Sequence, residues 1–291
     1  MVGEPSAEHE GRAVILVTGA TGRVGGSVLS QLLDKGVAVH ALVRDPGRAV
    51  LPDGVEAVRG DLADPAGLGP ALAGVDSVFL VWPTIAADHA APAAIAAIAR
   101  HARRVVYLSA NGVSADSTEG ILGSHAMLER LIENSGPEWT FLRPTGFAAN
   151  TLGWAPQIRA DGVVRWVHGA ARRALIHERD IAAVGALALT EDGHVGARHV
   201  LSGPAAISQV EQAHEIGRAI GRPVRFEEVA PELARRGIFA GLPAPVVDGI
   251  LASHAAMVAN PEQVTTTVER LTGSPARTFA EWAADHAAEF K

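Results

Sequence analysis

The sequence predicts an α/β fold, a doubly wound parallel sheet with a smaller, mainly helical cap toward the C-terminus. Three observations predict it. Short apolar runs rich in β-branched residues alternate with segments of helical spacing over the first half of the chain. A glycine-rich turn follows the first apolar run and opens a helix. Beyond Pro144 the alternation weakens, and the last 85 residues have mainly helical spacing.

The strands and helices of the first half follow from this alternation. Residues 1–11 show no periodicity and are expected to form a loose tail. Strands are expected at 13–17, 37–43, 55–58, 76–82, 104–108 and 139–142. Helices are expected over 24–33, 65–73, 88–101 and 124–134. Strands that alternate with helices at this spacing pair in parallel through right-handed crossovers.

The second half is less regular. Residues 147–173 show no clear period, after which we expect a strand near 174–177, a helix over 180–189 with Asp180 as its N-cap, and a strand near 197–202. Ser208–Glu211 and Thr278–Glu281 fit capping boxes at the starts of two later helices. We therefore assign residues 12–150, with the strands near 174–202, to a dinucleotide-binding domain. The substrate-binding cap is expected to comprise 151–173 and 203–291.

Composition excludes several classes of function. The 291 residues carry a net charge of −7 and no basic block, so we expect no nucleic-acid partner. The chain has no cysteine, and its 12 histidines lack ligand spacing, so no metal is expected. The G-x-S-x-G elbow is absent, so a hydrolase is not expected. The sequence has no apolar run long enough to predict a membrane span. We expect a cytoplasmic monomer or homodimer that acts on a small molecule.

The glycine-rich turn carries the strongest functional signal. It reads Thr18-Gly-Ala-Thr-Gly-Arg-Val-Gly-Gly26, with glycines spaced as G-x-x-G-x-x-G. Gly19 permits the tight turn, Gly22 lets backbone N–H groups approach a pyrophosphate, and Gly25 lets the helix pack against the sheet. The helix N-terminus adds partial positive charge for the anion. The turn therefore predicts a Rossmann dinucleotide site that includes Gly19, Thr21, Gly22, Arg23, Val24 and Gly25.

The end of the second strand indicates which dinucleotide is bound. Arg44 comes directly after this strand, where a guanidinium suits the 2′-phosphate of NADP, and Arg23 can add charge. Asp45 leaves NAD open, so NADP(H) is favoured rather than required. Asp61, followed by Leu62, comes after the third strand. Its carboxylate either accepts from the adenine amino group or caps the next helix.

Taken together, these residues resemble the atypical, NmrA-like branch of the short-chain dehydrogenase/reductases, which includes NAD(P)H:quinone oxidoreductases and triphenylmethane-reductase-like enzymes. The resemblance covers nearly the whole chain after residue 12. It rests on ILVTGATGRVGG at 15–26, ALVRDP at 41–46, GDLADP at 60–65, VVYLSANG at 105–112, HAMLERLIENSGPEWTFLRPTGFAAN at 125–150, ERDIAAV at 178–184, LSGPAAIS at 201–208 and LTGSPARTFAEWAADH at 271–286.

The resemblance implies where the nicotinamide and the substrate lie. Val81, Trp82 and Pro83, at the end of the fourth strand, are expected to wall the nicotinamide. The segment containing Pro144 and Thr145 is expected to lie along its carboxamide. Candidate substrate contacts are Trp82, Asn111, Phe147, Asn150, Trp154 and Trp166. For the tryptophans of the irregular stretch, the alternatives are stacking on a flat ligand and packing inside the cap.

The superfamily's usual catalytic set is a serine followed by Tyr-x-x-x-Lys, and this chain departs from it. Ser109 matches the serine, but His125 and Glu129 occupy the Tyr and Lys positions, while Tyr107 lies inside the fifth strand. His125 is expected to shuttle a proton, with Glu129 on the same helical face orienting the imidazole and raising its pKa. Ser109 is expected to donate to a substrate oxygen. The alternatives are a surface His–Glu pair and a loop-cap serine.

The missing Tyr–Lys pair guides the choice of function. Reduction of a ketone creates an alkoxide that needs an acid, whereas reduction of a quinone creates a phenolate-like anion of pKa about 10. We therefore predict an NAD(P)H-dependent reductase that transfers hydride to a flat conjugated acceptor such as a quinone. Two alternatives stay open, namely a non-enzymatic NAD(P)-sensing regulator and a ketone reductase or epimerase acting on a polyketide-like substrate.

Overall fold

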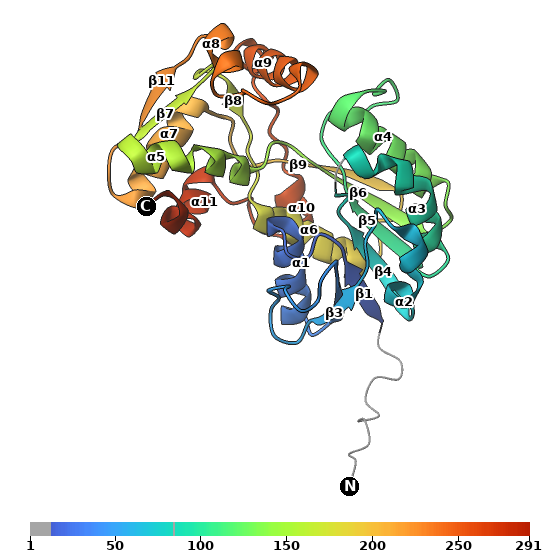
Figure 1. The fold of residues 1–291 in the computed structure, drawn as a ribbon. Helices are drawn as coiled ribbons and strands as arrows, with labels where there is room; N and C mark the ends of the chain where they lie inside the picture. Colours follow the sequence, from blue (N-terminus) through green and yellow to red (C-terminus); the bar gives the residue numbers. More distant parts are fainter. Residues whose placement is uncertain (1–12, 84) are drawn as a thin grey trace. The chain divides into compact units, whose positions relative to one another are not determined.

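The chain folds into two units, which are described separately. The computed structural model describes residues 13–83 and 85–291, and Figure 1 labels their elements. The first unit runs to Leu142 and resumes over Ala182–Arg198, and the second comprises Arg143–Ile181 and His199–Lys291. The second unit thus begins before residue 150 and includes 174–181 and 199–202, which the sequence assigned to the first domain. Hydrogen bonds explain this division, because the Thr145 N–H donates to Leu201 and the Ile176 N–H donates to Gly146.

The first unit is organised by a seven-stranded sheet of order β3-β2-β1-β4-β5-β6-β9. All pairings from β3 to β6 are parallel, which confirms the doubly wound arrangement. The strands are β1 (Val14–Val17), β2 (Ala38–Val43), β3 (Glu56–Arg59), β4 (Val75–Leu80), β5 (Arg104–Leu108), β6 (Glu138–Pro144) and β9 (Ala197–Leu201).

Helices cover both faces of this sheet (Figure 1). They are α1 (Arg23–Asp34), α2 (Gly69–Leu72), α3 (Ala91–Ala99), α4 (Gly120–Glu133) and α6 (Glu178–Thr190), with 3₁₀ turns η1 (Pro65–Gly67) and η2 (Ile85–Ala90). Ile95 of α3 and Leu128 of α4 share one apolar cluster with Leu80 of β4, whereas Gly185 of α6 lies against Phe79, which points to the opposite face.

Helix α4 begins at Gly120, four residues before the expected start. Ile121 and Leu122 in its first turn are exposed, so they do not extend the apolar period that marks the buried face. Among the residues that the structure describes, no helix is long and apolar enough to cross a membrane.

The second unit combines short strands with helices. Its strands are β7 (Val163–Trp166), β8 (Arg172–Arg173), β10 (Ile207–Ser208) and β11 (Arg225–Glu228), paired as β7 with β11 in parallel and β8 with β10 antiparallel. Its helices are α5 (Ala155–Asp161), α7 (Gln209–Ile220), α8 (Pro231–Arg236), α9 (Ala244–Ala259), α10 (Thr267–Thr272) and α11 (Phe279–Asp285), with 3₁₀ turns η3 (Ala148–Trp154) and η4 (Ala287–Phe290).

Sequence reasoning placed these short strands poorly. The strand expected near 174–177 is wrong, because only Ile176 makes an isolated bridge, to Phe147. The mainly polar and exposed β11 lacks the apolar alternation that predicts a strand. Both expected capping boxes are confirmed at the starts of α7 and α11. Asp180, by contrast, lies inside the first turn of α6, where its carboxylate accepts from the Arg277 backbone N–H at 2.7 Å and pairs with the Arg277 guanidinium.

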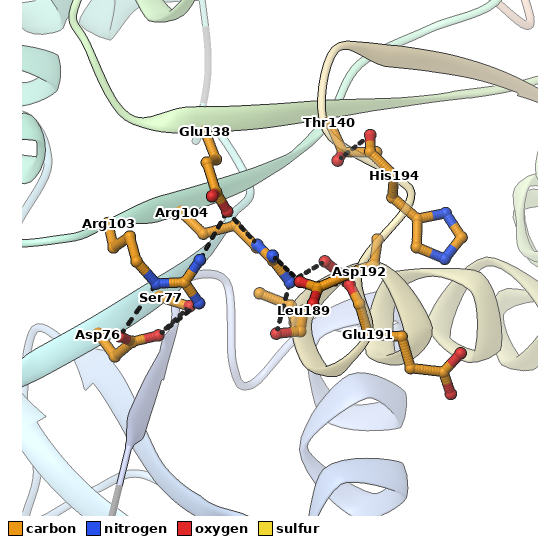
Figure 2. A network of polar contacts seen from close by, with 11 residues as sticks. Asp76, Ser77, Arg103, Arg104, Glu138, Thr140, Leu189, Glu191, Asp192 and His194 are labelled. Carbon is orange, nitrogen blue, oxygen red and sulfur yellow. Dashed lines mark hydrogen bonds and ion pairs between the residues drawn. The ribbon is translucent and has the colours of Figure 1, made fainter.

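At the amino ends of the sheet strands, Arg104 is buried in a polar network (Figure 2). Its Nε donates to Glu138 at 2.9 Å, its Nη1 to the Glu191 carbonyl at 2.9 Å and its Nη2 to Asp192 at 3.0 Å. These contacts join the starts of β5 and β6 to the C-terminal end of α6, where the helix dipole favours a cation.

Candidate active site

The glycine turn has the geometry that its sequence predicts. Gly19 has a φ of +60°, and a Cβ on it would lie 2.9 Å from the Val81 Cβ. A Cβ on Gly25 would overlap the Gly19 carbonyl, so the first turn of α1 passes directly against the loop. Gly22 is the N-cap of α1 and has no side chain to cap the helix. The turn therefore directs a helix N-terminus, with its partial positive charge, toward any bound anion.

A cavity of about 880 Å³ opens above this turn, formed by residues of the first unit. Nine predicted cofactor residues line it, namely Gly19, Thr21, Gly22, Arg44, Asp61, Leu62, Val81, Trp82 and Pro83. The other three predicted residues of the turn, Arg23, Val24 and Gly25, lie in the first turn of α1 outside the lining. The cavity follows the carboxyl ends of β1 to β4, where doubly wound folds bind dinucleotides.

Arg48 also lines the cavity, and sequence reasoning did not single it out. It lies four residues after Arg44, and both side chains are exposed. The signal that could have found it is the second arginine in the same loop. Two guanidinium groups beside one cavity give it positive potential at the end of β2.

Thr18 is a second residue that the sequence analysis did not use. Its buried hydroxyl donates to the Val81 carbonyl at 2.9 Å and accepts from the Val81 N–H at 2.7 Å. This double contact joins the glycine turn to the end of β4. Asp61 forms an Asx turn, because its carboxylate accepts a hydrogen bond from the Ala63 N–H at 2.9 Å. The residue also lines the cavity.

Asp88 holds Trp82, one wall of the cavity. The Trp82 indole N–H donates to Oδ1 of Asp88 at 2.9 Å, and the Ser124 hydroxyl donates to the same oxygen at 3.0 Å. One carboxylate of η2 thus fixes the indole at the end of β4 and joins it to α4. A buried indole N–H generally needs such a partner, but the sequence did not show which acidic residue supplies it.

At the end of β5, the three residues at the expected catalytic positions, Ser109, His125 and Glu129, pair in an unexpected way that includes Tyr107. The Ser109 hydroxyl donates to Glu129 at 2.5 Å, and both side chains are buried. The Tyr107 hydroxyl lies 2.6 Å from Nδ1 of His125. Ser109 was expected to donate to a substrate oxygen, but its single proton is used by a carboxylate, which is a stronger acceptor than a neutral carbonyl.

The electrostatics of His125 also differ from the expectation. Burial lowers the pKa of His125, and the charges of Glu129 and Asp88, which act to raise this pKa, do not offset it. The predicted rise is therefore wrong, although Glu129 acts in the predicted direction. Burial, together with the charges of Glu129 and Asp88, raises the pKa of the Tyr107 phenol well above its ordinary value. At neutral pH the pair consists of a neutral phenol and a neutral imidazole.

The remaining predicted residues are dispersed. In the first unit, Asn111 is exposed just beyond β5. In the second, Pro144 and Thr145 are buried, and the Thr145 hydroxyl donates to the Ala174 carbonyl at 2.6 Å. Phe147 is partly exposed and Asn150 is exposed, at the start of η3.

The two tryptophans proposed for ligand stacking pack inside the second unit instead. Trp154 is only 4% exposed, and its ring meets those of Trp166 and Phe226 edge-on at 6.4 Å. Trp166, which is partly exposed, also packs edge-on against Phe239 at 5.0 Å. For Trp154 the structure therefore favours the second alternative, packing inside the cap, because neighbouring rings cover its surface.

A family model described as NAD(P)H-binding matches residues 19–192, which is more than half of the chain. The chain belongs to the NAD(P)H-binding family. The match starts at Gly19 and includes every residue that lines the cavity except Thr18. The cradle fits a dinucleotide on structural grounds as well, because a side chain on Gly19 or Gly25 would collide with the backbone or with Val81.

Two relatives of this family member are reductases. It is 44% identical to the (4-alkanoyl-5-oxo-2,5-dihydrofuran-3-yl)methyl phosphate reductase of Streptomyces griseus, over 95% of this chain and 99% of the relative. It is 36% identical to the NAD(P)H azoreductase of Xenophilus azovorans, over 95% of this chain and 99% of that protein.

A solved structure agrees with these sequence relatives. The NADPH-dependent quinone oxidoreductase of Escherichia coli, crystallised with NADPH, is 26% identical and superposes with a TM-score of 0.78, covering 93% of this chain and 99% of the other. The predicted resemblance to NmrA-like, atypical short-chain reductases is confirmed, as is the class of enzyme, an NAD(P)H-dependent oxidoreductase.

Proposed function

We propose that this reductase transfers hydride from NADPH to an electron-poor, conjugated acceptor, either a quinone or an unsaturated lactone that carries an acyl group. The observation that carries the proposal is the pairing of Ser109 with Glu129 and of Tyr107 with His125. These pairs leave the usual serine without its donor proton and place a neutral imidazole at the position of the usual tyrosine. Acceptors whose reduced anions are already stabilised suit such a site.

The chemistry of the acceptor explains why this site suffices. NADPH bound above the glycine turn would supply a hydride from C4 to the electron-poor carbon of the acceptor and would leave as NADP⁺. The electron pair of the acceptor's double bond then moves to a carbonyl oxygen, where it forms a phenolate-like or enolate anion. An anion whose conjugate acid has a pKa of about 10 can take its proton from water, without a strong acid. Positioning of the hydride donor and the acceptor then supplies most of the acceleration.

His125 acts in this proposal as a neutral hydrogen-bond donor. A phenol that keeps its proton donates to Nδ1, and this contact selects the tautomer that carries its proton on Nε2. His125 then offers Nε2–H to the developing oxyanion, and Tyr107 is a positioning residue for it. One neutral hydrogen bond contributes about 1 kcal/mol, or roughly fivefold in rate, whereas an imidazolium acid would contribute about 10²–10⁴-fold.

Cofactor choice follows from the exposed arginines at the end of β2. Arg44 and Arg48 both line the cavity, and guanidinium groups bind a 2′-phosphate with charge-assisted hydrogen bonds. This arrangement supports NADPH over NADH, with Arg44 as the principal contact.

Turnover tests the function directly. We expect NADPH oxidation at 340 nm with quinones and with an alkanoyl-substituted unsaturated lactone, and slower oxidation with simple ketones by at least about 10²-fold. Because burial lowers the pKa of His125, any change of kcat with its charge should occur below the pH at which an ordinary imidazole titrates. Tight NADPH binding without turnover of any conjugated acceptor would contradict the proposal.

Variants of the Tyr–His pair test the mechanism. His125→Ala should lower kcat on a conjugated acceptor by no more than about tenfold. Tyr107→Phe should release Nδ1, raise the pKa of His125 and bring a pH dependence into kcat, because the hydrogen bond from the phenol favours the neutral imidazole. Nitrogen-15 NMR of labelled histidine would show the change of tautomer. A thousandfold loss in His125→Ala, with NADPH affinity intact, would show that proton donation is essential.

A further inference from the structure

Arg173 of β8 is partly buried, and one nitrogen of its guanidinium has no hydrogen-bond partner. The neighbouring Arg172 is 42% exposed and bonds the Ala206 carbonyl and Glu211. Arg173 is only 20% exposed, and its buried Nε has no hydrogen-bond partner in the structure. Its nearest carboxylate oxygen, on Glu262, lies 3.7 Å from Nε. A buried N–H group without a hydrogen bond is costly, and a bound anion would satisfy it.

The chain makes room for this guanidinium at Gly146. A Cβ on Gly146 would overlap the guanidinium, so only glycine lets the Arg173 head group lie against this backbone. Gly146 directly precedes Phe147, a partly exposed residue that we predict to contact the acceptor. The charge therefore lies beside a predicted substrate contact within the same unit.

Two histidines share the electrostatic environment of Arg173. His254 follows Val247 and Leu251 on the buried face of α9, and its Nδ1 lies 2.8 Å from the Ile250 carbonyl. Burial lowers the pKa of His254, the hydrogen bond to Ile250 acts to raise it, and the electrostatic effects of Arg173 and His168 lower it further. His168 has a φ of +53°, a left-handed conformation that is strained for a side chain of this size.

We propose that Arg173, His254 and His168 bind a phosphate monoester group carried by the conjugated acceptor. The guanidinium fork matches two phosphate oxygens, and each histidine supplies one further contact. The proposal rests on the proposed function and narrows its substrate class. It agrees with the relative from Streptomyces griseus, whose name specifies a methyl phosphate on its lactone substrate.

A dianion at this site changes the charge state of His254. In the free protein, burial and the charge of Arg173 favour the neutral imidazole, and Nδ1 donates to Ile250, so Nε2 has a lone pair rather than a proton. A phosphate reverses this preference, because two negative charges outweigh the repulsion from Arg173 and His168. Glu262, whose carboxylate faces Arg173 and accepts from the Ala174 N–H at 3.0 Å, opposes the anion and limits its affinity. Binding should therefore take up a proton.

The test compares a phosphorylated acceptor with its alcohol. The probes are an alkanoyl-oxo-dihydrofuranyl methyl phosphate and the same lactone with a free hydroxymethyl group. We expect wild-type kcat/KM to favour the phosphate by about a hundredfold, and Arg173→Met to reduce that preference at least about tenfold. Arg172→Met is the matched control and should keep the preference. Glu262→Gln, which removes the opposing charge, should increase it.

Calorimetry provides a readout that does not depend on turnover. Titration of the phosphate ester into protein saturated with NADP⁺, in buffers of different ionisation enthalpy, should show proton uptake that His254→Gln removes. Equal kcat/KM for ester and alcohol in wild type would overturn the site. Equal losses on both substrates in Arg173→Met would also overturn it, because they would indicate a structural role. Binding of the ester without NADPH oxidation would instead overturn the proposed function and leave the site intact.

Discussion

The two ends of the sheet in the first unit handle polar groups in opposite ways. At the amino ends, Arg104 is 3% exposed and directs its guanidinium to two carboxylates and to carbonyls at the end of α6 (Figure 2). At the carboxyl ends, Arg44 and Arg48 are exposed beside the cavity, and the N-cap of α1 is a glycine without a side chain. One end uses its polar groups to hold the fold, and the other keeps them accessible to a ligand.

The difference teaches how to separate stability from function in this chain. Substitution at the amino ends should change the free energy of unfolding and leave cofactor binding unchanged, since the length of the strands separates these residues from the cavity. Substitution at the carboxyl ends should do the reverse. The following predictions go from the largest expected effect to the smallest.

Arg104→Met should lower the free energy of unfolding by about 3 kcal/mol, because it leaves several carbonyls at the end of α6 without their buried donor. Urea unfolding measures this change. Arg103→Met is the matched control: Arg103 is 51% exposed, so its pairs with Asp76 and Glu138 should contribute at most about 1 kcal/mol. Similar losses in the two variants would contradict the comparison.

Gly22→Val should abolish measurable NADPH binding, a loss of at least about a hundredfold, while the protein stays folded. Even the Cβ would lie 3.1 Å from the Gly19 carbonyl oxygen, and the valine methyl groups would extend into the space for the pyrophosphate. The rise in thermal midpoint on adding NADPH measures binding. Gly69→Val, at a helical glycine with open space around it, should keep that rise. A normal rise in Gly22→Val would show that the pyrophosphate lies elsewhere.

Arg44→Ala should reduce the preference for NADPH over NADH by about ten- to a hundredfold, the cost of one charge-assisted contact of about 1.5–3 kcal/mol. Titration of both cofactors measures the ratio. Lys35→Ala, which removes an exposed cation just after α1, controls for the change in net charge. An unchanged ratio in Arg44→Ala would assign the 2′-phosphate to another residue, of which Arg48 is the first to test.

The sequence by itself determined the parts of the molecule that depend on local pattern. The spacing of Gly19, Gly22 and Gly25 after an apolar run specified the turn, since Gly19 has a positive φ and the other two glycines lie against its carbonyl group. Alternation of strands and helices specified the sheet, and both capping boxes were readable because they need only four consecutive residues.

Only the tertiary structure decided which polar side chains meet. Tyr107 and His125 are 18 residues apart, Trp82 meets Asp88 across the start of η2, and Arg173 lies against Gly146 although 27 positions separate them in the sequence. Periodicity shows the face on which a residue lies but not its hydrogen-bond partner, which depends on how separate elements pack. Burial then set the protonation of His125 against the prediction from its helical neighbour, because loss of water around the ring outweighs the charges of Glu129 and Asp88.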